Sequence, residues 1–246
     1  MTEFLKVLAL AAIPGAGNFV RVLAGEVSRV GGRGLSYALH AAAGVMLGVV
    51  GVEILPRALE VSQPWLIVVA FAIGSAAAVA IDRVLHGLVG EQAGPWGVWT
   101  ATAVDLFSDG LLIGAGSTLD FRRGLLLAIA QVPADLPEGF STSASFQAAG
   151  IGRGRRLLYA LAFFVPLAAG AAMGFFLVRG QSDLLKHGLL SFAGGLLATL
   201  AIDEVLGEAH ESDEEHSSLQ TLTMTAGFAF FALLSIYFEL RVGLVC

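Results

Sequence analysis

Long apolar stretches separated by short polar segments run through the whole chain. A helix needs about 20 predominantly apolar residues to cross the hydrocarbon core of a bilayer, and this criterion finds eight candidates. Their approximate bounds are 5–25, 35–57, 64–86, 95–117, 123–148, 156–178, 185–206 and 218–240. The pattern therefore predicts an all-α membrane protein, a bundle of eight transmembrane helices.

The fourth and fifth stretches differ from the others because they carry acids in their interiors. Asp105 and Asp109 interrupt 95–117, and Asp135 and Glu138 interrupt 123–148. A carboxylate at membrane depth is costly and is retained mainly for function. We therefore expect both helices to face a polar pathway instead of lipid.

Composition and charge support a membrane protein. Hydrophobic residues make up 56% of the chain and charged residues 14%, whereas about a quarter of the residues of soluble proteins are charged. The net charge is -6 and the basic residues are dispersed, which excludes a nucleic-acid partner. Since the connections are short, we expect 1–246 to form a single transmembrane domain, either alone or as a homodimer.

The two ends of the chain bear on topology. We interpret 5–25 as a first membrane helix and not as a signal peptide, because Pro14-Gly15 and a single lysine give no clear cleavage site. The 14 basic residues divide evenly between the two sides of an eight-helix arrangement. Their concentration in the short loops 26–34 and 152–156 favours a cytoplasmic location for these loops, with both termini outside.

An internal repeat relates the second and seventh stretches. A shift of 151 residues superposes 53–60 on 204–211 and Ala42-Ala43-Gly44 on Ala193-Gly194-Gly195. An odd number of crossings separates these helices, so they run in opposite directions. The match predicts an inverted repeat of helices 1–3 and 6–8 around helices 4–5, an arrangement typical of alternating-access transporters. Chance similarity between two apolar helices is the alternative.

The spacing of the acids predicts that they meet. Asp105 and Asp109 are four residues apart, and Asp135 and Glu138 three apart, so each pair shares a helical face. Converging carboxylates in a low-dielectric setting require protons or a bound cation. An all-oxygen ligand set favours a hard divalent cation. Pairing with basic residues is the structural alternative, which we disfavour because no Lys or Arg lies inside either helix.

Further polar residues extend the predicted pathway. Pro133 and Pro137 free backbone carbonyls in the fifth helix. The residues to which we assign pathway or neighbouring roles are Ser108, Gln131, Ser141, Glu53, Glu204, His210 and His216. The two histidines belong to the charged segment 208–216, which is either a solvated loop or a site of weak metal capture at one mouth of the pathway.

Two motifs connect the chain to a known family. Residues 105–110 read Asp-Leu-Phe-Ser-Asp-Gly and 134–139 read Ala-Asp-Leu-Pro-Glu-Gly. They resemble the fourth-helix His-Asn-x-Pro-Glu-Gly and fifth-helix (His/Gln)-(Asn/Asp)-x-Pro-Glu-Gly motifs of the ZIP (Zrt-, Irt-like protein) family, in its short, prokaryote-type branch. The resemblance implies a divalent metal transporter of a prokaryotic plasma (inner) membrane. It implies no enzyme activity and no cofactor beyond the transported ion, which is Zn, Mn, Fe or Cd.

Departures from the family motifs change the expected site. The family often binds two metals, and Leu106 and Val165 here occupy two positions that hold the second. We therefore expect a single transported metal held by Asp105, Asp109 and Glu138, with Asp135 nearby as a weaker ligand or proton acceptor. Because Asp105 replaces a histidine, transport of Mn, Fe or a broad range of divalent ions becomes credible.

Two other functions compete with a transporter that works by alternating access. A channel-like metal facilitator would use the same site and differ in the saturation of its flux. An intramembrane aspartyl protease also uses two buried aspartates, but its Gly-x-Gly-Asp motif is absent from this sequence.

Overall fold

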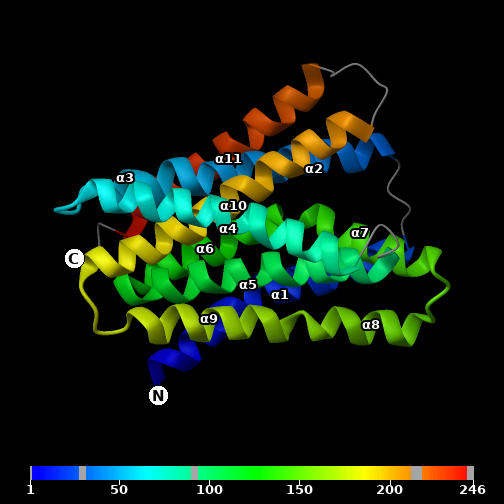
Figure 1. Ribbon diagram of the computed structural model, residues 1–246, viewed down its shortest axis with the longest axis horizontal. Helices are drawn as coiled ribbons and strands as arrows, with labels where there is room; N and C mark the ends of the chain where they lie inside the picture. Colours follow the sequence, from blue (N-terminus) through cyan, green and yellow to red (C-terminus); the bar gives the residue numbers. More distant parts are fainter. Residues whose placement is uncertain (1, 28–31, 90–93, 212–217, 243–246) are drawn as a thin grey trace.

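The computed structural model describes residues 2–27, 32–89, 94–211 and 218–242, and in these ranges the chain is helical with no strand. Each apolar stretch corresponds to one helix or to consecutive helical segments (Figure 1). The elements are α1 (Thr2–Val27), α2 (Gly32–Gly48), the π-helix η1 (Val49–Ile54), α3 (Leu55–Ala58), α4 (Pro64–Val89), α5 (Gly94–Leu119), α6 (Phe121–Ala134), α7 (Leu136–Ala148), α8 (Arg153–Ala162), α9 (Phe164–Val178), α10 (Asp183–Glu211) and α11 (Ser218–Val242).

Membrane-length helices dominate the bundle. Within the described ranges, seven helical segments are long and apolar enough to cross a membrane: Thr2–Glu26, Ser36–Ala58, Pro64–Val84, Gly94–Leu119, Arg153–Val178, Asp183–Asp203 and Ser218–Leu240. The expectation of an all-α integral membrane protein is thus confirmed. The expected fifth helix, 123–148, is not among these segments because it is divided at Asp135 into α6 and α7, of 14 and 13 residues. An eighth crossing therefore stays a prediction.

Prolines explain where the long helices are interrupted. Asp135 lies between the last residue of α6 and the first of α7. Pro137 stands in the first turn of α7, where a missing N–H costs no hydrogen bond. Pro166 clashes with the carbonyl four residues earlier, that of Ala162, and Ala162 is the last residue of α8. Pro56 likewise follows the π-helix η1. The interruptions are therefore encoded locally.

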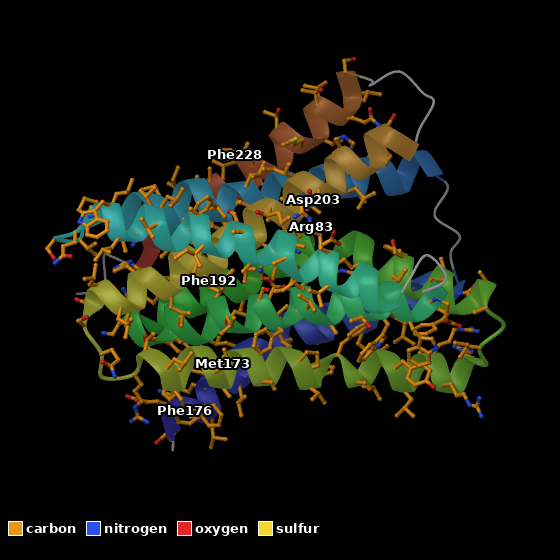
Figure 2. All side chains as sticks on the ribbon, viewed as in Figure 1. Arg83, Met173, Phe176, Phe192, Asp203 and Phe228 are labelled. Atoms are coloured by element: carbon orange, nitrogen blue, oxygen red, sulfur yellow. The ribbon has the colours of Figure 1, made fainter. Side chains whose placement is uncertain are left out.

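The outer face of the bundle is apolar. In Figure 1, α8 and α9 follow each other along one long edge and α11 lies at the opposite edge. Figure 2 shows Met173 and Phe176 on the α9 side and Phe228 on the α11 side, and these side chains are 46%, 59% and 40% exposed. Such a surface suits contact with lipid chains.

Glycines set the closest approach of α5 to α9. A Cβ atom at Gly110 or Gly114 would collide with the carbonyl oxygens of Leu167 or Ala171. Gly170 and Gly174 of α9 face the carbonyls of Phe107 and Leu111 of α5 in return. Small residues at such positions allow backbones to touch within lipid, and they lock α5, which carries two of the acids, against its neighbour.

Two other helix pairs share one kind of contact. In the pair α4 and α10, and again in the pair α2 and α11, a glycine of each helix faces a backbone carbonyl of the other. The contacts are Gly74 with Phe192, Gly195 with Phe71, Gly44 with Met224 and Gly227 with Ala41. A side chain at any of these glycines would separate the helices.

Candidate metal centre

Three acids meet where α5 packs on the junction of α6 and α7. Asp105 and Asp109 lie on successive turns of α5 and are 3% and 0% exposed, and Asp135 lies at the junction and is fully buried. One carboxylate oxygen from each of the three lies within 4.8 Å of the other two. The structure thus brings together acids that stand 26 to 30 residues apart, as the spacing predicts.

Glu138 joins this group from the first turn of α7. Its carboxyl group lies beside that of Asp105, although it is outside the set of three mutually close oxygens. Asp135 in turn lies against Asp109. The four acids form one cluster, in which Asp135 belongs to the set of close oxygens and Glu138 lies at its edge beside Asp105.

The cluster has little compensation from hydrogen bonds. No N–H or hydroxyl group of the described residues donates to either oxygen of Asp105 or to Oδ2 of Asp109. At an effective dielectric constant of about 20, two unit charges 4.8 Å apart repel by about 3.5 kcal/mol. Buried acceptors of this kind normally have partners. A cation or shared protons would supply the missing compensation.

The predicted neighbouring residues occupy different places. Gln131 of α6 is buried and its Nε2 donates to Oδ1 of Asp109, so it holds that carboxylate. The Ser108 hydroxyl donates to the Val104 carbonyl of its own helix at 3.1 Å. Ser141 is half-buried on α7. Gln131 is therefore the predicted neighbour that the structure places directly on the acids.

Glu53 belongs to a separate ionic cluster. It is 3% exposed, and its carboxylate pairs with Arg57 at 3.3 Å and Arg123 at 3.2 Å, while the Ser235 hydroxyl donates to it at 3.3 Å. This cluster joins η1 and α3 to the start of α6 and to α11. The described side chains do not include Glu204 and His210 at the end of α10, and His216 lies outside the described residues.

Sequence reasoning missed two polar residues of α1. Asn18 and Arg21 are 0% and 6% exposed, and the charged groups that act on the Arg21 guanidinium are Asp135 and Glu138. The absence of Lys and Arg from the helices that carry the acids therefore does not leave the acids without a nearby cation, because Arg21 acts on Asp135 and Glu138 from α1. The signal was an Asn-x-x-Arg pair on one face of an otherwise apolar stretch.

Buried carboxylates inside a bundle of membrane-length helices define an integral membrane protein with a candidate cation site. Residues 92–235 match the family model described as ZIP Zinc transporter, and this match spans more than half of the chain and both acidic motifs. The chain belongs to the ZIP zinc transporter family, which confirms the resemblance of the motifs. A search of curated proteins found no match. Membership implies transport of divalent metal ions, and members of the family are transporters and not enzymes.

Proposed function

We propose that this protein carries a divalent metal cation across a membrane through a site made of Asp105, Asp109, Asp135 and Glu138. The observation that carries the proposal is the set of three buried carboxylate oxygens within 4.8 Å of one another in a chain of this family. Four acids without a bound cation would repel one another, and a divalent ion would relieve that repulsion.

The ligand chemistry restricts the metal. Within the described part of the chain, the group of close ligands contains carboxylates and neither histidine nor cysteine. Oxygen ligands suit hard cations, whereas Zn²⁺ in proteins usually takes nitrogen or sulfur ligands as well. We propose Mn²⁺ and Fe²⁺ as substrates, with Zn²⁺ and Cd²⁺ as further members of a broad range, and a single ion bound at a time.

We further propose that α6 and α7 cross the membrane together as one broken helix, which makes eight crossings in all. Broken helices are tolerated at membrane depth where they line a polar cavity, and transporters often place substrate sites at such breaks. Asp135 stands at the break itself, between Pro133 and Pro137. The interruption therefore presents a ligand and freed backbone carbonyls to the same ion.

Alternating access by an inverted repeat completes the proposal. The reciprocal glycine contacts support it, because the two helix pairs correspond residue by residue. Ala41 and Gly44 match Phe192 and Gly195 at the shift of 151 residues, and Phe71 and Gly74 match Met224 and Gly227 at a shift of 153. The same glycine–carbonyl contact thus occurs in two helix pairs that the inverted repeat relates. Two such related units can rock relative to a central site and open it to either side of the membrane in turn.

Metal flux into proteoliposomes tests this function. We expect saturable uptake of Mn²⁺, Fe²⁺, Cd²⁺, Zn²⁺ or Co²⁺ by the wild type and its loss in Asp109→Ala and Glu138→Ala. Asp183→Ala, which removes an exposed acid outside the cluster, is the matched control and should transport normally. Unchanged flux in both site variants would overturn the site, and flux that rises linearly with metal concentration would favour a channel-like facilitator.

A further inference from the structure

Arg21 is a buried cation that no part of the proposed mechanism uses. Its side chain lies on α1 with 6% exposure, and Nη1 donates to no acceptor among the described residues. A buried guanidinium with incomplete hydrogen bonding is costly, and charged groups at membrane depth are retained mainly for function. The acids Asp135 and Glu138 are the charges that act on it.

Two glycines make room for the Arg21 side chain where α1 meets the broken helix. A Cβ atom at Gly139 of α7 would lie 2.8 Å from Cβ of Arg21 and 3.3 Å from Oδ1 of Asn18, so the bare glycine lets α7 close on α1. A Cβ atom at Gly17 would lie 3.4 Å from Nη2 of Arg21 and 3.4 Å from Cγ1 of Val132 of α6. The guanidinium therefore folds back over Gly17, in a space that a larger side chain would fill.

The net charge of the site depends on this cation. Four carboxylates carry four negative charges when ionised, which is enough to neutralise two divalent ions. Arg21 packs against Gly139, the residue after Glu138, and its guanidinium interacts with the charges of Asp135 and Glu138. This fixed cation offsets one of the four charges permanently and repels a further cation on the same side. Leu106, fully buried on α5 next to Asp105, contributes no ligand atom there. With Arg21, the ionised site has three net negative charges, which is enough to neutralise one divalent ion but not two.

We propose that Arg21 is an internal counter-cation that takes the electrostatic place of a second metal ion and limits the site to one divalent ion. This inference rests on the proposed function, since it takes the four acids as the metal site. Arg21 also continues to act on Asp135 and Glu138 after the metal leaves. It therefore lowers the repulsion within the empty site and helps the metal-free protein to return to the state that accepts the next ion.

Metal stoichiometry of the purified protein tests the role of Arg21. The ions bound per chain are measured by equilibrium dialysis against Cd²⁺ and elemental analysis, for the wild type, Arg21→Gln and Arg21→Lys. Arg179→Gln is the matched control, because it removes a half-exposed arginine that is paired with Glu3. We expect one ion per chain for the wild type, Arg21→Lys and Arg179→Gln, and two for Arg21→Gln. Arg21→Met, a neutral variant of similar length, replaces Arg21→Gln if the latter does not elute as a folded species.

The outcomes separate the two proposals. A wild type that binds no Cd²⁺ would overturn the proposed function itself. One ion in both the wild type and the neutral variants would leave that function standing and overturn the role of Arg21. Two ions in Arg21→Lys would show that positive charge alone does not limit the site, which also contradicts the inference.

Discussion

Asp109→Asn should stabilise the empty protein while it weakens metal binding. The replacement keeps the shape of the side chain and an oxygen that can accept from Gln131, but it removes one charge from the cluster. Asp109 has an oxygen within 4.8 Å of one in Asp105 and one in Asp135, and two unit charges at that limit repel by about 3.5 kcal/mol at an effective dielectric constant of about 20. Shared protons relieve most of this repulsion, so we expect a net gain of about 1 kcal/mol and a rise in Tm of about 2–4 °C.

The opposite effect is expected on metal affinity. Substitutions next to metal ligands typically cost about 10–100-fold in affinity, and the loss of a charged ligand should cost at least as much. Since a ligand that binds only the folded state raises its stability according to its concentration and Kd, added Mn²⁺ or Cd²⁺ should raise the Tm of the wild type much more than that of Asp109→Asn.

Thermal unfolding in detergent, with a chelator and then with each metal, measures both effects. Asp183→Asn is the control, because this exposed acid lies outside the cluster and should leave the response to metal unchanged. A variant that melts below the wild type in chelator would show that the acids do not repel one another in the empty site. An undiminished response to metal in Asp109→Asn would show that Asp109 is not a ligand.

The packing, an ion pair and the number of metals give three further predictions. Gly110→Ala forces α5 away from α9 and should cost about 1–3 kcal/mol or more of stability, whereas Gly154→Ala, with open space around it, should cost nothing; a melting comparison of the two decides. Glu26→Gln breaks the bidentate pair with Arg156 and should cost about 1–3 kcal/mol in chemical unfolding. Crystals soaked in Cd²⁺ should show one anomalous peak at the acids, and two peaks of equal occupancy would contradict a single-ion site.

Hydropathy predicted where the helices lie but not where they are interrupted. The apolar stretches predicted every helical region in the described residues because the cost of placing a residue in lipid is a local property. The composition of 123–148 predicted one helix, but in the structure this helix is interrupted at Asp135. Pro133 and Pro137 signalled the interruption, and its position follows from the loss of backbone donors and the clash with preceding carbonyls.

The candidate metal site, like the helices, was predicted only in part from the sequence. The sequence by itself determined that Asp105 and Asp109 share a face, that Asp135 and Glu138 share another, and that both motifs belong to one family, since helical spacing and motif order are local. Only the tertiary structure decided that Asp135 lies against Asp109, that Gln131 holds Asp109, and that the charge of Arg21 acts on Asp135 and Glu138. These contacts depend on how α1, α5 and α6–α7 pack. Packing between helices follows from glycine contacts and shape, which leave no periodic signal in the chain.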